Sequence, residues 1–167
     1  MKALIVYHSY GGNTKELAQE IERNLLQESE ITLVDSCHVK ELNRSKNYET
    51  VLTYDVIILG SNTWGDGDLP KPMARLCDYL NDEQLDAVLA SKYTAVFGTG
   101  ETGYAHYCES VNQLASLLNG RSKLIVSLKV EQIYGSDDLH RIAAFTNKIN
   151  ARILSEQSNL LQDTTAV

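Results

Sequence analysis

The sequence predicts an α/β fold, a doubly wound sheet of five parallel strands with helices on both faces. Two observations lead to this fold class. Short apolar runs alternate along the chain with longer segments whose apolar residues recur at helical spacing. The chain has 167 residues, of which 43% are hydrophobic, which is enough for the core of one domain. Alternating strands and helices favour parallel pairing through right-handed crossovers.

Five short apolar runs predict the strands, because each is the length of a strand buried on both faces of a parallel sheet. The predicted strands are residues 3–7, 31–34, 56–60, 94–97 and 124–130. The first lies in MKALIVYHSY, which has one Lys and no cleavage site of small residues. We therefore expect a first strand there and not a signal peptide.

Four segments with apolar residues at helical spacing predict the helices. They are residues 14–26, a segment that starts at Pro70 and has its last apolar position at Leu80, residues 105–118 and residues 136–154. Residues 36–53 are weakly patterned and predict a short irregular helix or a loop. We expect residues 1–155 to form the domain and residues 156–167 a polar tail.

Composition argues against several classes of function. The net charge of −7 disfavours nucleic-acid binding, and no apolar run approaches the roughly 18–20 residues of a membrane span. The three cysteines, Cys37, Cys77 and Cys108, show neither CxxC nor metal-ligand spacing. They predict free thiols in a reducing, cytoplasmic compartment and no metal site.

Small and polar residues gather after three of the predicted strands. The segments are SYGGNT (9–14), SNTWGDGDLP (61–70) and GTGETGY (98–104), which together hold seven of the ten glycines and the only Trp. In doubly wound sheets, ligands bind beyond the carboxyl ends of the strands, where the strand order reverses. We therefore expect the three loops to form one site.

The first of these loops is suited to an anion. It leads into a predicted helix, whose N-terminus offers unpaired N–H groups and a partial positive charge. Gly11 and Gly12 allow a close approach of the backbone, and Ser9, Asn13 and Thr14 are side-chain donors. The loop contains no Lys or Arg and matches neither GxxxxGK[ST] nor GxGxxG. A helix cap with a tight turn explains the same residues equally well.

Two aromatic residues stand on the other two loops. Trp64 and Tyr104 are flanked by glycines and polar residues, and we expect them to cover a flat aromatic ligand. The alternative for Trp64 is a side chain folded back over the sheet edge. His106 is expected to be solvated, and His8 lies either near the site or in the packing beneath the helices. Uncharged hydrogen-bond donors suited to a phosphate, beside the aromatic side chains of Trp64 and Tyr104, predict a mononucleotide with a large flat ring.

Three segments carry a resemblance to a known family: LIVYHSYGGNT, LGSNTWGDGDLP and VFGTGETGYAHYCESVN. In their order and spacing the sequence resembles the flavodoxins, over nearly the whole chain to about residue 150. It lacks the extra loop of the long-chain type and so resembles the short-chain type. The resemblance implies the flavodoxin-like strand order 2-1-3-4-5. It also implies an FMN-dependent carrier that shuttles low-potential electrons between a reductase and acceptor enzymes.

The resemblance also implies a role for each loop. Residues 9–14 would surround the FMN phosphate, residues 61–63 would reach the ribityl chain, and the backbone of residues 98–103 would bond the pyrimidine edge. Trp64 and Tyr104 would pack on the two faces of the ring. In chain order, the residues that the resemblance assigns to FMN are Ser9, Tyr10, Gly11, Gly12, Asn13, Thr14, Ser61, Asn62, Thr63, Trp64, Gly65, Asp66, Gly67, Gly98, Thr99, Gly100, Gly103 and Tyr104.

Two positions depart from the family pattern. The family usually has a small residue where this chain has Tyr10, and often Thr, Ser or Met where it has Gly11. The hydroxyl absent at Gly11 predicts weaker phosphate binding unless backbone N–H groups suffice.

Two features of the loops predict how the flavin potential is tuned. The Gly65–Asp66 peptide is able to turn a carbonyl toward the reduced ring, because a positive φ is easy for Gly. The carboxylates of Asp66, Asp68 and Glu101 would disfavour an anionic reduced ring. They would also attract redox partners with basic docking faces, such as a flavodoxin reductase and acceptor oxidoreductases.

Other functions remain open at this point. An FMN-dependent NAD(P)H or quinone-type reductase needs a donor site, for which the chain has no evident insertion. A flavoprotein that activates the metal cofactor of ribonucleotide reductase would share fold and FMN. A flavin-free receiver module would need an acidic cluster after the first strand, which HSYGGNT lacks. We expect a monomer.

Overall fold

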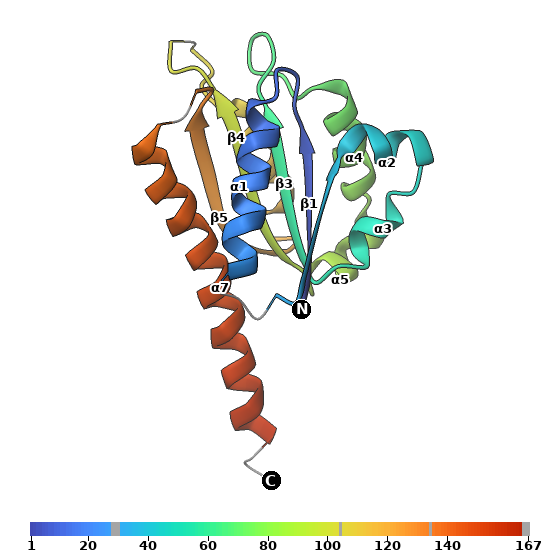
Figure 1. Ribbon diagram of the computed structural model, residues 1–167. Coiled ribbons are helices and arrows are strands. Elements are labelled where there is room, and N and C mark those ends of the chain that lie inside the picture. Colours follow the sequence, from blue (N-terminus) through green and yellow to red (C-terminus); the bar gives the residue numbers. More distant parts are fainter. Residues whose placement is uncertain (28–30, 104, 134, 165–167) are drawn as a thin grey trace.

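The computed structural model describes residues 1–27, 31–103, 105–133 and 135–164, and in these residues five parallel strands form one sheet (Figure 1). The sheet has the order β2-β1-β3-β4-β5, so the predicted fold class and strand order are confirmed. The strands are β1 (Lys2–His8), β2 (Leu33–His38), β3 (Val56–Asn62), β4 (Tyr93–Gly100) and β5 (Lys123–Glu131).

Helices cover both faces of this sheet. Helices α1 and α7 lie on one face, and α2, α4 and α6 lie on the other (Figure 1). In chain order the described helices are α1 (Asn13–Gln27), α2 (Val39–Ser45), α3 (Glu49–Leu52), α4 (Lys71–Leu80), the 3-10 helix η1 (Glu83–Leu85), α5 (Asp86–Leu89), α6 (Glu109–Leu118) and α7 (Ser136–Thr164). None of them is both long and apolar enough to cross a membrane, among the residues described.

Two apolar clusters hold the layers together, because successive side chains of a strand point to opposite faces. The cluster beneath α1 and α7 includes Ala3, Ile5, Ile58, Phe97, Leu17, Ile21, Ile142 and Phe145. The cluster beneath α4 and α6 includes Leu4, Val6, Ile57, Leu59, Val96, Met73, Leu76, Val111 and Leu114. The central strands are thus buried on both sides, as their continuous apolar runs predicted.

The second strand differs from its prediction. It begins at Leu33 and continues to His38, because each of its residues pairs with β1 from Lys2↔Leu33 to Tyr7↔His38. Residues 35–38 are polar and were therefore missing from the predicted run. A strand at the sheet edge tolerates them, since several of its side chains are partly open to solvent.

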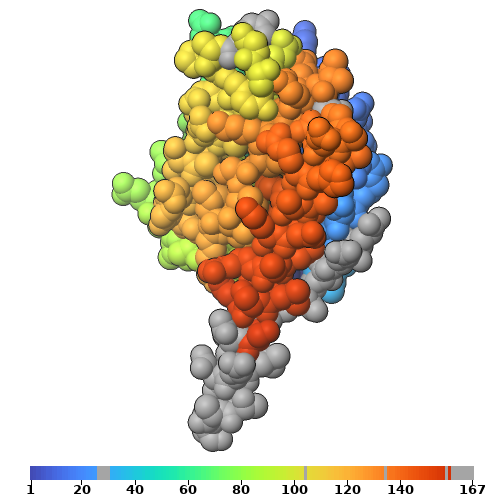
Figure 2. Space-filling model, turned by 90° about the vertical axis from the view of Figure 1, so that its left-hand side faces the viewer, coloured from blue at the N-terminus to red at the C-terminus, as the bar shows by residue number. Residues whose placement is uncertain are grey.

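Two helices also differ from their predicted bounds. Helix α6 begins at Glu109, since Cys108 before it has a left-handed backbone with φ of 49°. Helix α7 continues beyond the predicted end near Leu154 to Thr164, and its sequence contains no Gly or Pro. It crosses the face shown in Figure 2, where it is coloured orange to red. The division into a domain of residues 1–155 and a tail of residues 156–167 stays a prediction.

Candidate functional site

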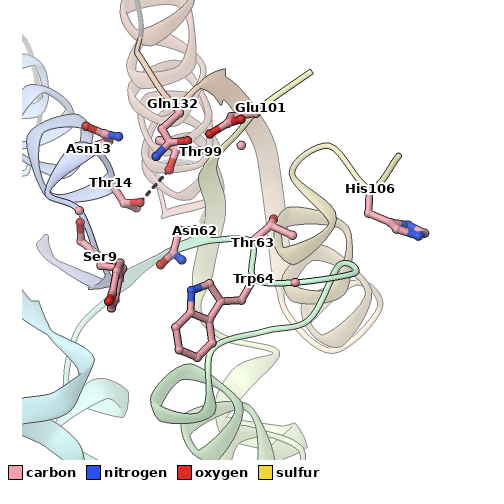
Figure 3. Close-up of a pocket in the computed structure, with 14 residues that line it drawn as sticks. Ser9, Asn13, Thr14, Asn62, Thr63, Trp64, Thr99, Glu101, His106 and Gln132 are labelled. Atoms are coloured by element: carbon pink, nitrogen blue, oxygen red, sulfur yellow. Dashed lines mark hydrogen bonds between the residues drawn. The ribbon is translucent and has the colours of Figure 1, made fainter. Parts of the chain in front are cut away.

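A cavity of about 340 Å³ lies at the carboxyl ends of β1, β3 and β4 (Figure 3). Its size is that of an ordinary small-molecule site. The lining residues are Ser9, Tyr10, Gly11, Asn13, Thr14, Asn62, Thr63, Trp64, Gly65, Thr99, Gly100, Glu101, His106 and Gln132. Within the described part of the chain, no Lys or Arg lines it.

The sheet register explains why segments about fifty residues apart meet here. His8 pairs with Ser61, Ser61 with Gly98, and Asn62 with Thr99, so the three loops leave the sheet at the same level. This is the meeting of loops that the topology predicted.

The polar end of the cavity lies at the N-terminus of α1. Gly12 has a left-handed φ of 101°, and its carbonyl accepts the first helical hydrogen bond from the Glu16 N–H at 2.9 Å. The Gly12 N–H donates to Oγ of Ser9 at 3.1 Å. The buried hydroxyls of Thr14 and Thr99 lie 2.8 Å apart and join this helix to β4 (Figure 3). The polar end of the cavity is thus built from a helix N-terminus and neutral donors, a combination that suits an anion.

Hydrogen bonds also fix the loop that follows β3. The Thr63 hydroxyl donates to Oγ of Ser110 at 3.0 Å, and the Ser110 hydroxyl donates to the Ser61 carbonyl at 3.2 Å. The Ser110 N–H returns to Oγ1 of Thr63 at 3.2 Å. These bonds tie the loop to the first turn of α6.

The aromatic end of the cavity is formed by a tight turn. The Trp64 carbonyl accepts hydrogen bonds from the N–H groups of Gly67 at 3.1 Å and Asp68 at 2.8 Å. Gly65 and Gly67 have φ of 49° and 108°, values that favour glycine. The Trp64 side chain is 50% exposed, and its ring centroid lies 5.8 Å from that of Tyr10, which is 77% exposed. Trp64 is therefore not folded into the core.

Comparisons with known proteins agree with this geometry. The model of the flavodoxin family matches residues 5–144. The chain belongs to the flavodoxin family. Probable flavodoxin 2 of Bacillus subtilis (strain 168) is 36% identical over 132 residues, which are 78% of this chain and 82% of that protein. Probable flavodoxin 1 of the same strain is 33% identical over 139 residues, 82% of each chain.

Solved structures give the same family. The crystal structure of oxidised Flavodoxin 2 from Bacillus cereus superposes with a TM-score of 0.76 at 34% identity and covers 91% of this chain and 99% of that chain. Flavodoxins bind FMN, carry electrons and act with redox partner proteins, so this chain is an FMN-dependent electron carrier.

The flavodoxin cavity includes most of the residues predicted for it. The predicted residues that do not line it are Gly12, Ser61, Asp66, Gly67, Gly98 and Gly103. Ser61 is buried and its hydroxyl donates to the Asn62 carbonyl at 2.9 Å. A Cβ at Gly98 would lie 2.6 Å from a methyl of Val111, so this glycine allows the close packing of β4 and α6. Tyr104 lies outside the described residues, and its role as the second wall stays a prediction.

Three residues that border this flavodoxin cavity were not assigned to it from the sequence. His106, expected in solvent, lines it, although Figure 3 shows its ring pointing away from the other labelled residues. Glu101 was interpreted only as an acid of the same loop. Gln132 follows β5, the strand next to β4. The rule that ligands bind beyond the carboxyl ends of the strands was applied to β1, β3 and β4, and its application to β5 as well would have found Gln132.

Two ionisable groups close to the cavity have shifted pKa values. Burial lowers the pKa of His8, although its hydrogen bond to Asn62 acts in the opposite direction. The hydrogen bond with Thr102 lowers the pKa of Glu131, which favours its carboxylate form. The rim of the cavity is therefore acidic and its inner polar end is neutral.

Proposed function

We propose that this cavity holds FMN with the phosphate at the N-terminus of α1 and the ring against Trp64. One observation supports this orientation above others. Neutral donors gather at one end of the cavity, and a half-exposed Trp stands at the other. A nucleotide with a phosphate at one end and a flat ring at the other matches that polarity.

The residues at the polar end fit a phosphate. An added Cβ at Gly11 or Gly12 would meet no atom within 4 Å, so there is open space beside the first turn of α1. Hydroxyl and amide groups of Ser9, Asn13 and Thr14 border that space. A phosphate here would be held by uncharged dipoles and the helix N-terminus, without a counter-ion.

The residues at the other end fit a planar ring. Trp64 would cover one face, and Tyr104 on the third loop would cover the other. Bound FMN supplies the redox chemistry, and the protein sets its potential. Among the residues that the structure describes, Glu101 is the carboxylate that lines the cavity, and it would disfavour added negative charge on the ring.

The surroundings of the cavity support partners with basic docking faces, such as a flavodoxin reductase and acceptor oxidoreductases. Glu101 lines the cavity, and Glu131 lines a second hollow that shares Glu101 and Gln132 with it. Asp66 and Asp68 lie in the turn that bears Trp64. A net charge of −7 would attract such partners over a distance. We also propose that the chain is a monomer and that it lies in the cytoplasm. The three free cysteines among the described residues support the second of these proposals.

Titration with flavins tests the proposal. The purified, flavin-free chain is titrated with FMN and with riboflavin, and quenching of flavin fluorescence gives both dissociation constants. We expect FMN to bind more tightly, because riboflavin lacks the phosphate. Equal affinities would contradict the position of the phosphate, and no quenching by either flavin would contradict the whole site. Steady NADPH oxidation by the FMN-loaded protein alone would favour a reductase over a carrier.

A further inference from the structure

Two histidines lie directly behind the wall of the cavity. His8 ends β1 and is buried, and His38 ends the neighbouring strand β2. Their ring centroids are 5.1 Å apart with an angle of 63° between the planes. Neither ring lines the cavity, but each forms a hydrogen bond with a residue that does, namely Asn62 and Ser9.

The bond to Asn62 assigns the tautomer of His8. Nδ1 of His8 lies 2.7 Å from Oδ1 of Asn62. An amide oxygen only accepts hydrogen bonds, so Nδ1 of His8 bears the proton. With its oxygen held from behind, Asn62 has its amide NH₂ group left for the cavity. Figure 3 shows Asn62 between Ser9 and Trp64, at the centre of the site.

The bonds of His38 assign the opposite tautomer. Its Nδ1 accepts the Lys40 N–H at 3.1 Å and thereby caps α2. A neutral imidazole with an accepting Nδ1 has its proton on Nε2. Nε2 therefore donates to the Ser9 carbonyl at 3.2 Å, and its 3.3 Å contact with the Ser9 N–H is not a hydrogen bond in this tautomer. The Ser9 carbonyl is thus held on the protein side of the loop.

The surroundings of His8 favour its neutral form. Burial lowers its pKa, and so do the Lys40 ammonium of α2 and any positive charge on His38 of β2, while the bond to Asn62 from β3 raises it. Burial raises the pKa values of the neighbouring Tyr7 and Cys37, and Glu41, also in α2, raises them further.

We propose that His8 and His38 are positioning residues of the FMN site, a pair of neutral imidazoles in opposite tautomers. His8 turns the Asn62 amide so that its N–H groups face the cofactor. His38 keeps the Ser9 carbonyl away from the phosphate, so that residues 9–14 present donors to it. This role rests on the proposed FMN site, but the tautomers themselves do not.

Nitrogen-15 NMR of the histidine side chains tests the tautomers in the full, flavin-free chain. We expect the proton on Nδ1 in His8 and on Nε2 in His38. A proton on Nε2 in His8, or on Nδ1 in His38, would overturn the proposal. This measurement needs neither FMN nor a variant, so it decides the tautomers even if no flavin binds.

Affinity for FMN tests the positioning of Asn62. His8→Leu should weaken FMN binding by about threefold to tenfold, because the amide loses its partner. His8→Asn has a side-chain N–H near the position of Nδ1 and should restore affinity to within about twofold. His140→Leu, at an exposed site on α7, is the matched control. Circular dichroism verifies that each variant is folded.

The outcomes separate the two proposals. If the natural sequence binds FMN and His8→Leu binds equally well, or if His8→Asn is as weak as His8→Leu, the positioning role is wrong and the FMN site stands. If the natural sequence does not bind FMN, the proposed site is wrong, and NMR alone decides the tautomers.

Discussion

Replacement of Trp64 by Ala is the sharpest test of where the flavin ring lies. The turn of residues 64–68 is held by backbone hydrogen bonds and by two glycines with positive φ, and none of these involves the indole ring. The substitution therefore removes a wall of the cavity without removing the turn that supports it. We expect FMN affinity to fall while the fold persists.

The size of this effect follows from the exposed area. Trp64 is 50% exposed. A Trp side chain of about 250 Å² would then offer about 125 Å², of which a ring on one face would cover about 60 Å². At about 25 cal/mol per Å² this burial contributes about 1.5 kcal/mol, or more than about tenfold in the dissociation constant.

Quenching of FMN fluorescence measures the dissociation constant of FMN. Trp64 is the only Trp in the sequence, so its fluorescence in the natural sequence reports FMN binding independently. Trp64→Phe should give an intermediate affinity. Val88→Ala removes a partly exposed apolar side chain on α5, outside the cavity, and should have no effect. If Trp64→Ala binds FMN as tightly as the natural sequence, the ring does not lie against this side chain.

Three further predictions concern the polar end, the charge and the pH dependence. Gly11→Ser should tighten FMN binding by about threefold to tenfold, because the added Cβ meets no atom within 4 Å and the hydroxyl adds a hydrogen-bond donor. The control Gly12→Ser, at φ of 101°, should instead lower the melting temperature. Weaker FMN binding by Gly11→Ser would contradict the argument. Glu101→Gln should raise the reduction potential of bound FMN by about 40 mV in a potentiometric titration, since one nearby charge contributes about 1 kcal/mol. Asp68→Asn, outside the cavity lining, should change the potential less. An unchanged potential in Glu101→Gln would refute the role of Glu101. The pKa of His8 is lowered on folding, so between about pH 6.5 and the folded pKa the unfolded chain alone takes up the proton, and the free energy of unfolding measured with urea should fall as the pH decreases. His8→Asn should reduce this fall, and an identical pH profile for that variant would contradict the role of His8.

The sequence was sufficient to predict the sheet and the meeting of the three loops. The apolar runs of β1, β3 and β4 are buried on both faces, so local pattern and tertiary environment agree. Their following loops contain glycines and hydroxyls that have no place in a core. Topology then brings these loops to one edge, where eleven of the eighteen residues assigned to FMN line one cavity.

Other features depended on contacts that no local pattern reveals. The strand at the edge, β2, extends through polar residues because β1 supplies its hydrogen bonds. His38 reaches Ser9, a residue that lines the cavity, only through that extension, and its ring also caps α2. In the same way, the role of Thr63 is set by Ser110, 47 residues later in the chain.

The two ends of the cavity differ in how firmly they are held, and this difference has a consequence for binding. Bonds from neighbouring elements fix the polar end: Thr14 to Thr99, His8 to Asn62 and His38 to Ser9. At the aromatic end, Trp64 is half-exposed, Tyr10 is largely exposed and their rings contact each other. A preformed end reduces the entropy lost on association, whereas an exposed aromatic pair is able to rearrange around a ring. The phosphate end should therefore supply selectivity for FMN over riboflavin, and the aromatic end should adapt to the ring once the phosphate is bound.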